Sequence, residues 1–259
     1  MWAIITGGSK GLGLAMAKEL YSEAYSVVLV GRSKGRLEAA MKQVLRCAPK
    51  KRYVYSPRPK VLTFPCDLSS PDGVQSLHKW TSSHSIVPDV LVNNAGAYLY
   101  SDLQDLGQKK IDNILSLDID TPVNLCRIYH DEMACDGGRH IVNIASYSVY
   151  MPIRGLSLYA GSKAFIRTFG KCLAKEFGPS GIKVTTIAPA GIDTDLMNLR
   201  PSVRNIARRL GFLAKPETVA RISCRVMKIP FIHYWIPLWY NVLFIPFLML
   251  FQWVYKRVL

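Results

Sequence analysis

Three residues in the second half of the chain have side chains suited to proton transfer. Tyr159 and Lys163 are four positions apart, so on a helix they share one face, and Ser146 precedes Tyr159 by thirteen residues. A phenol is a poor acid or base at neutral pH, but a nearby ammonium stabilises the phenolate and makes proton transfer easier. The Ser146 hydroxyl could hydrogen-bond a substrate oxygen on which negative charge develops. An isolated pair at this spacing is usually an exposed helical pair, so the prediction depends on further motifs.

A glycine-rich segment near the N-terminus, TGGSKGLG at residues 6–13, lies between an apolar run and an amphipathic stretch. Glycines there permit a tight turn and let backbone N–H groups approach a pyrophosphate at the positive end of a helix. A lone glycine pattern is weak evidence for a dinucleotide site, but its position between a strand and a helix strengthens this prediction. The candidate cofactor-binding residues in this segment are Thr6, Gly7, Ser9, Lys10, Gly11, Leu12 and Gly13.

The residues after the second expected strand indicate which dinucleotide is bound. A domain that binds NAD usually has an acidic residue there to bind the ribose 2′-hydroxyl. This chain has Gly31 followed by Arg32, and Lys10 lies inside the glycine segment. Two cations would attract a 2′-phosphate, and an arginine can bind it through paired hydrogen bonds. We therefore expect NADPH as the cofactor.

Together these motifs resemble the short-chain dehydrogenase/reductase family over roughly residues 2–195. The glycine segment, the NNAG sequence at 93–96 and the set Ser146, Tyr159 and Lys163 carry the resemblance. It implies that Tyr159 donates the proton, that Lys163 also binds the nicotinamide ribose, and that Asp67 contacts the adenine. Lys10 and Arg32 match the basic pair of NADPH-preferring members. The remaining cofactor contacts that it implies are Asn94, Ala95, Gly96, Pro189, Ile192 and Thr194.

Two residues depart from the family pattern. Asp118 occupies the place of the family's fourth catalytic residue, usually an asparagine that helps hold a water linking the lysine to solvent. Its backbone carbonyl could do the same, but its charge would also perturb Lys163. Ala190 stands where the family's nicotinamide-side turn has a glycine. We keep Asp118 as a candidate catalytic residue.

These residues need a parallel sheet to bring them together. Short β-branched runs alternate with longer amphipathic stretches, such as Leu12–Tyr25, which is typical of an α/β fold with crossover helices. The resemblance implies a Rossmann-type doubly wound sheet of about seven strands. We expect one such domain over residues 1–237 and an apolar helix over 238–259. The expected strands are Trp2–Thr6, Ser26–Val30, Val61–Pro65, Val90–Val92, His140–Ile144, Lys183–Ile187 and Phe231–Ile236.

The carboxy-terminal segment suggests contact with a membrane. Ile229–Tyr255 has no charged residue of the Asp, Glu, Lys or Arg types, and Arg200–Lys228 has eight basic residues against one acid. The eighteen residues Leu238–Tyr255 would span about 27 Å as a helix, slightly less than a bilayer core of about 30 Å. We expect an interfacial or re-entrant helix on the cytoplasmic side of a membrane, peripheral or monotopic. A dimer interface or a cover over the substrate pocket is the alternative, in an otherwise cytoplasmic protein.

The chain has 33 Lys and Arg against 18 Asp and Glu, a net charge of +15, which favours anionic partners. No nucleic-acid recognition motif and no metal-ligand spacing is visible, so we expect neither partner. The expected function is NADPH-dependent reduction of a ketone to an alcohol on an apolar, lipid-like substrate. The general layout resembles that of family members that act on 3-ketosphinganine, 3-oxoacyl thioesters or steroids. We also expect the protein to form a homodimer or homotetramer. The alternative is a non-catalytic NADPH-binding protein at a membrane.

Overall fold

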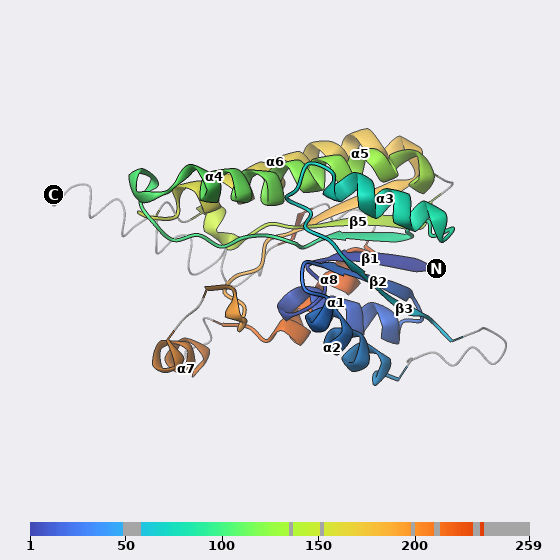
Figure 1. The fold of residues 1–259 in the computed structure, drawn as a ribbon, viewed down its shortest axis with the longest axis horizontal. Helices are drawn as coiled ribbons and strands as arrows, with labels where there is room; N and C mark the ends of the chain where they lie inside the picture. The colour runs from blue at the N-terminus through green and yellow to red at the C-terminus, as the bar shows by residue number, and fades with distance from the viewer. Residues whose placement is uncertain are drawn as a thin grey trace.

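The computed structural model describes residues 1–48, 58–134, 137–150, 153–197, 200–209, 213–229 and 234–235. Strands and helices alternate along these residues (Figure 1). The strands are β1 Trp2–Thr6, β2 Ser26–Gly31, β3 Val61–Pro65, β4 Val90–Asn93, β5 Arg139–Ile144, β6 Ile182–Ile187 and β7 Tyr234–Trp235. The α-helices are α1 Gly11–Ser22, α2 Lys34–Leu45, α3 Gly73–Ser83, α4 Gln108–Leu115, α5 Thr121–Met133, α6 Ser157–Phe177, α7 Pro201–Arg209 and α8 Pro216–Val226. Short 3-10 turns are η1 Leu103–Asp105, η3 Tyr147–Tyr150, η4 Gly178–Ser180 and η5 Asp195–Met197, and η2 Ser116–Asp120 is a π-helix.

All seven strands form one parallel sheet in the order β3-β2-β1-β4-β5-β6-β7. The order reverses at β1, where β2 pairs on one side and β4 on the other. Ligands of open parallel sheets bind outside the carboxyl ends of the strands at this switch point. The predicted doubly wound Rossmann-type sheet is therefore confirmed. β7 lies within the expected last strand, Phe231–Ile236.

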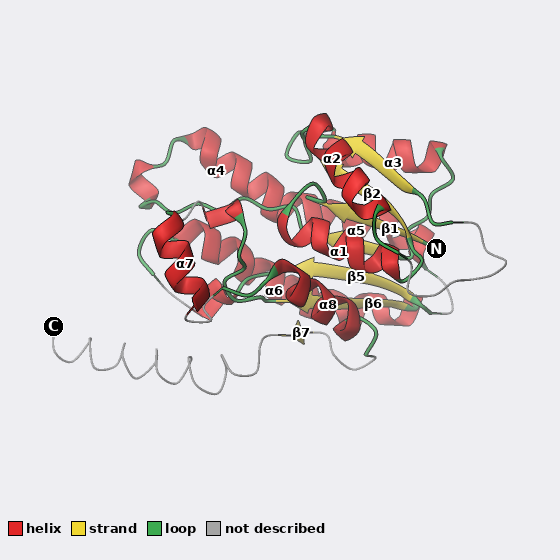
Figure 2. Cartoon of the chain, turned by 90° about the horizontal axis from the view of Figure 1, so that it is seen from below, coloured by secondary structure: helices red, strands yellow, loops and turns green. Residues whose placement is uncertain are grey.

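Helices cover both faces of the sheet, which explains why its strands are apolar on both sides (Figure 2). One core cluster joins α1, α2 and α8 to alternate strand residues such as Ala3 and Ile5. The other joins α3, α5 and α6 to the residues between them, such as Ile4. This alternation follows the two-residue repeat of a strand.

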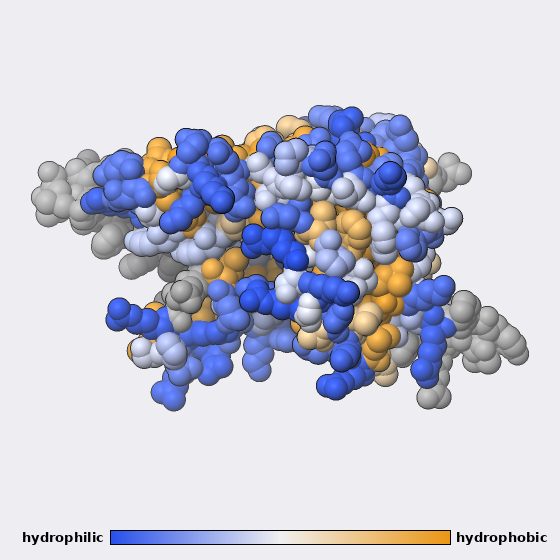
Figure 3. Space-filling model, in the orientation of Figure 1, coloured by the Kyte–Doolittle hydropathy of each residue, from blue (hydrophilic) through white to orange (hydrophobic). Residues whose placement is uncertain are grey.

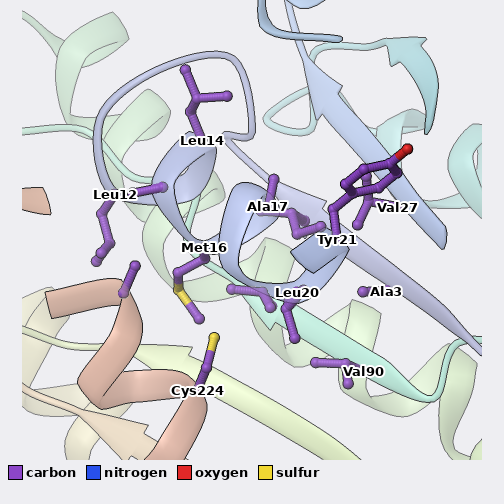
Figure 4. Packing of buried hydrophobic residues seen from close by; sticks show 14 of the residues in the cluster. Ala3, Leu12, Leu14, Met16, Ala17, Leu20, Tyr21, Val27, Val90 and Cys224 are labelled. Carbon is purple, nitrogen blue, oxygen red and sulfur yellow. The ribbon is translucent and has the colours of Figure 1, made fainter. Parts of the chain in front are cut away.

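The C-terminal end of the first helix is fixed by a local hydrogen-bonding motif. Leu12, Met16 and Leu20 of α1 point toward Cys224 of α8 and toward the sheet (Figure 4). The helix ends at Ser22, earlier than the expected Tyr25, because Ala24 adopts a left-handed backbone with φ of 70°. The N–H of Ala24 donates to Tyr21 O and that of Tyr25 to Leu20 O, the two hydrogen bonds of a Schellman motif. The prediction of a helix reaching Tyr25 was therefore wrong by one turn.

The π-helix η2 joins α4 to α5 where the sequence has Asp118 and, four residues later, Pro122. Proline lacks the N–H that an α-helix would direct at the carbonyl of residue 118. The Thr121 hydroxyl donates to the carbonyl oxygens of Leu68 and Ser116 at 2.8 and 2.9 Å. This break in the helical repeat turns the Asp118 side chain inward, where its exposed fraction is 0%.

The predicted apolar helix over residues 238–259 lies outside the described residues, as does most of the basic segment Pro49–Lys60. Among the helices that the structure describes, none has the length and apolar character needed to cross a membrane.

Candidate active site

A cavity of about 820 Å³ opens along the carboxyl ends of the strands. The hollow in the middle of the face shown in Figure 3 has apolar side chains in its floor and polar side chains around its rim. The cavity receives residues from the ends of β1, β2, β4, β5 and β6, so motifs far apart in the sequence meet there. The predicted site residues that line it are Gly7, Ser9, Lys10, Gly11, Leu12, Arg32, Asp67, Asn94, Ala95, Gly96, Ser146, Tyr159, Lys163, Pro189, Ile192 and Thr194.

The glycine segment between β1 and α1 fits a dinucleotide pyrophosphate because its backbone has no room for side chains. A Cβ atom at Gly13 would lie 2.4 Å from the Gly7 carbonyl oxygen and 2.5 Å from Asn94 Nδ2. Gly7 itself has a φ of 65°, a conformation that L residues rarely adopt. The chain therefore folds back tightly, and the N-terminal N–H groups of α1 face the cavity, as phosphate binding requires.

Thr6 and Gly13 do not line the cavity but shape its wall. Thr6 is 1% exposed, and its hydroxyl donates to Val92 O at 3.0 Å. The hydroxyl oxygen of Thr6, Oγ1, also accepts hydrogen bonds from the N–H groups of Asn94 and Ala95, both at 2.9 Å. One threonine thus joins the end of β1 to the NNAG turn after β4. The structure places Thr6 as a residue that positions this turn.

One end of the cavity is strongly basic. Lys10 and Arg32 line it as predicted, and Lys18 and Arg36 line it as well. A Cβ at Gly31 would make ordinary van der Waals contact, 3.6 Å from Leu37 Cδ2 and 3.7 Å from Ser9 Oγ. Sequence reasoning missed Lys18 and Arg36. Lys18 lies in the second half of α1 and Arg36 in the first turn of α2, and their shared position became visible only once the two helices were placed beside the same cavity.

Asp67 lies at the same end, after β3. Its Oδ1 accepts hydrogen bonds from the N–H and the hydroxyl of Ser69, at 3.0 and 2.7 Å. These hydrogen bonds, chiefly the one from the hydroxyl, and the nearby charge of Arg32 hold the pKa of Asp67 below its ordinary value. The carboxylate is therefore ionised at neutral pH and available as a hydrogen-bond acceptor.

The predicted proton-transfer residues meet at the other end. Tyr159 and Lys163 lie on the same face of α6, and both are nearly buried, at 7% and 6% exposure. The Lys163 ammonium lies 5.8 Å from the centre of the Tyr159 ring. Ser146 follows β5, where its Oγ accepts the N–H of Ser148 at 3.1 Å. The structure thus brings all three together against the same cavity.

Asp118 lies behind this group rather than in the cavity wall. One of its carboxylate oxygens is 2.9 Å from Lys163 Nζ, and the other accepts the N–H of Ala97 at 2.8 Å. This ion pair favours the ammonium form of Lys163. Burial lowers the pKa of Lys163, but Asp118, with a smaller effect of Tyr159, more than offsets it, so the pKa is raised. The expected effect of the Asp118 charge on Lys163 is therefore present.

The nicotinamide-side loop after β6 is held over the glycine segment. Asp193 N–H donates to Ala214 O at 2.9 Å, and Ala214 N–H donates to Gly191 O at 2.8 Å, which ties the loop to the start of α8. The Thr194 methyl group lies 3.2 Å from the position of a Cβ at Gly11. Pro189, Ile192 and Thr194 line the cavity, and so does Ala190.

The part of the cavity beyond Tyr159 is lined by residues that the sequence motifs did not indicate. They are mainly aromatic and aliphatic and come from four separate segments. Tyr98 packs edge-on against Tyr159, with ring centroids 5.0 Å apart. These lining residues are Tyr98, Tyr147, Leu156, Leu196 and Leu213.

Comparison with known proteins agrees with this geometry. The family model for short chain dehydrogenases matches residues 1–204. An uncharacterized oxidoreductase of Staphylococcus epidermidis is 29% identical over 194 residues, covering 75% of this chain and 79% of the relative. The protein therefore belongs to the short-chain dehydrogenase family, is an oxidoreductase, and has the nicotinamide dinucleotide site of that family.

Solved structures resemble the chain over nearly its whole length. A short-chain dehydrogenase/reductase from Serratia marcescens superposes with a TM-score of 0.77 at 25% identity, covering 91% of this chain and 95% of that one. A short-chain dehydrogenase from Burkholderia cenocepacia in complex with NADP also has a TM-score of 0.77 and 25% identity, with 90% and 93% covered.

Proposed function

We propose that the protein is an NADPH-dependent reductase that converts a ketone on an apolar, lipid-like substrate to an alcohol. The observation that carries this proposal is a single cavity with a basic end at Lys10 and Arg32 and with Tyr159, Lys163 and Ser146 at the other end. A dinucleotide is the ligand whose two halves would occupy both ends. The apolar side chains beyond Tyr159 support the choice of substrate class.

The preference for NADPH rests on charge at the adenosine end. Four cations line that end, from the glycine segment, α1 and the start of α2, and no carboxylate follows β2 directly. A 2′-phosphate would gain charge-assisted hydrogen bonds from Arg32 that a 2′-hydroxyl would not. The Burkholderia relative was solved in complex with NADP, which supports the same assignment.

The roles of the chain's own residues follow from their positions. The chemistry that bound NADPH supplies is hydride transfer to the substrate carbonyl carbon. Tyr159 donates its phenolic proton to the carbonyl oxygen, which gains the electron pair as the carbon is reduced. Ser146 hydrogen-bonds the same oxygen, and Lys163 keeps a positive charge beside the phenol and binds the nicotinamide ribose.

The substrate is apolar near its ketone. Tyr98, Tyr147 and Leu156 line the wall next to Tyr159, and Leu196 and Leu213 line the nicotinamide side. Such a wall stabilises hydrocarbon by removing it from water but offers few polar partners. Long-chain 3-oxoacyl compounds, 3-ketosphinganine and steroid ketones all satisfy this description.

The experiment is a substrate panel. NADPH oxidation would be followed with those three ketone classes and with small water-soluble ketones of matched carbonyl type, and repeated with NADH. We expect kcat/KM to rise with apolar length or area and to be higher with NADPH. Binding of NADPH without turnover of any ketone would contradict the enzymatic proposal, and best activity on small polar ketones would contradict the substrate class.

We also propose that the protein works at the cytoplasmic surface of a membrane, and α7 supports this together with the apolar segment 238–255. Arg204 of α7 binds Asp193 Oδ1 at 2.5 Å and Asp195 Oδ1 at 2.9 Å. This attachment turns Arg204 toward the protein and leaves Val203 and Ile206 48% and 58% exposed, with Arg208 and Arg209 exposed as well. An apolar face directed outward and flanked by arginines fits an anionic bilayer surface.

The double variant Val203→Ser, Ile206→Ser tests this proposal, with Val87→Ser as the control because Val87 is exposed elsewhere, before β4. We expect the double variant to bind anionic phospholipid vesicles more weakly than the control does, in a co-sedimentation assay at constant salt. Equal binding of the two variants would contradict a role for α7.

A further inference from the structure

The ion pair of Asp118 and Lys163 is almost fully buried, although Lys163 also lines the cavity. The side chains are 0% and 8% exposed, and their closest atoms lie 2.9 Å apart. The second carboxylate oxygen accepts the Ala97 N–H, and the Ser162 hydroxyl donates to the first at 3.3 Å. A Cβ at Gly96 would lie 3.0 Å from Lys163 Nζ and 3.3 Å from Asp118 Oδ1, so the backbone closes over the pair.

The charged neighbours of Tyr159 are few. Lys163 comes from the same helix, Asp118 from η2, and the phenol of Tyr98 from the segment after β4. Burial is the main cause that raises the pKa of Tyr98, with Tyr159 and Tyr100 contributing, so Tyr98 is uncharged at neutral pH. The cation nearest to Tyr159 is therefore Lys163, 5.8 Å from the ring centre, and the carboxylate of Asp118 is paired with that cation.

Resting on the proposed reductase function, we propose that Asp118 is a fixed counter-ion that retains both protons of the Tyr159–Lys163 pair to a higher pH than a neutral side chain would. A buried negative charge favours the protonated form of every group near it. Removing it makes the first proton of the pair easier to lose, whether from the ammonium or from the phenol. Asp118 acts through Lys163 and is thus a positioning residue.

This counter-ion defines a pH range for the reaction. Ketone reduction needs the phenolic proton on Tyr159 and the charge on Lys163, so kcat/KM for the ketone falls once the pair loses a proton. With Asp118 in place that fall occurs at higher pH. An asparagine, the residue usual at this position in the family, would leave the ammonium without its buried partner and move the fall to lower pH.

The test is Asp118→Asn, with Asp120→Asn as the matched control, because Asp120 belongs to the same π-helix but is exposed. In the protein without cofactor, Tyr159 is followed by ultraviolet difference absorbance, using Tyr159→Phe to subtract the other tyrosines. Lys163 is followed by nuclear magnetic resonance of its labelled side chain. We expect the first proton loss of the pair to move down by about one pH unit or more in Asp118→Asn and not in Asp120→Asn.

The alkaline limb of kcat/KM for ketone reduction should move down by a similar amount. A first proton loss at unchanged or higher pH in Asp118→Asn would overturn the proposal, and because it is read without substrate, this result is independent of the reductase function. If Asp118→Asn does not fold, Asp118→Ser replaces it. In the unaltered protein, the ammonium of Lys163 should persist above the pH at which the exposed lysines titrate, and earlier loss would also overturn the proposal.

Discussion

At the end of β2, the side chain after Gly31 is the one that we propose selects NADPH over NADH. Arg32 lies there with Lys10, Lys18 and Arg36 around the same space. Replacing Arg32 with Ala should raise KM for NADPH more than KM for NADH. Charge-assisted hydrogen bonds contribute about 1.5–3 kcal/mol, so we expect the ratio of the two KM values to change by about tenfold or more.

The control for this prediction is Arg46→Ala, which removes an equal charge at the far, exposed end of α2. Steady-state kinetics with both nucleotides measures the two KM values. Equal changes for NADPH and NADH in the Arg32 variant would show that Arg32 does not bind the 2′-phosphate.

Most of the residues predicted from the motifs and from the family resemblance line the cavity, because glycine segments and a Tyr-Lys pair on one helical face have few uses in combination. Residue spacing was not enough to predict the contacts of Asp118. Charge at position 118 was visible, but its distance from Lys163 depends on the π-helix that Pro122 and Thr121 stabilise. The lining residues Tyr98, Leu196 and Leu213 also carry no motif, since apolar side chains near a strand end resemble core residues.

At the scale of elements, the end of α1 offers a direct test of the local backbone account. Ala24 occupies the left-handed position of a Schellman motif, with φ of 70°. Replacing Ala24 with Gly should stabilise the fold by about 0.5–1 kcal/mol, because relief of the Cβ penalty exceeds the added freedom of the unfolded chain. Urea unfolding at unchanged slope measures this free energy.

The matched control is Ala39→Gly, an exposed alanine inside α2. Glycine there should destabilise the protein by about 1 kcal/mol, because the same Ala→Gly change is made at a position with an ordinary helical backbone, where glycine has the lower helix propensity. Opposite signs are thus expected for the two substitutions. Destabilisation by both would mean that Ala24 is not under strain.

The central strands β1, β2 and β4 were predictable because both faces are covered, which makes each a mostly apolar run within a residue of its observed limits. Helix limits were less predictable. The apolar pattern of α1 continues through Tyr25, which is 8% exposed, although the helix has already ended. Burial patterns report which side chains enter the core, and backbone hydrogen bonds decide where the helix stops.

For the whole molecule, the proposal of membrane attachment predicts that the segment which contacts lipid can be removed without loss of the folded sheet. Residues 242–259 follow β7, the last strand of the sheet. Removing them should release the protein from membranes and leave NADPH binding intact, because the seven Leu, Phe and Trp residues of 243–253 are lost. These could each contribute about 1.5–3 kcal/mol at most in lipid. They are Leu243, Phe244, Phe247, Leu248, Leu250, Phe251 and Trp253.

Fractionation of the full-length and truncated chains at low and high salt measures this release. The basic residues that remain should give only weak attachment that high salt removes, since surface charges are screened over about 10 Å at moderate ionic strength. A full-length protein that is soluble without detergent and does not bind vesicles would contradict the membrane proposal. The segment would then fit a dimer contact or a pocket cover.

The central proposal is that this cavity reduces a ketone with Tyr159 as the proton donor, and Tyr159→Phe tests it most directly. The substitution keeps the ring that packs against Tyr98 and removes only the hydroxyl, so NADPH binding should remain nearly unchanged. The measurement is kcat for the best ketone of the panel, together with the dissociation constant for NADPH. We expect kcat to fall well below about a tenth of its original value, a loss greater than about 1.4 kcal/mol of transition-state stabilisation. A variant that binds NADPH normally and retains more than that tenth would contradict the assignment of Tyr159 as the acid.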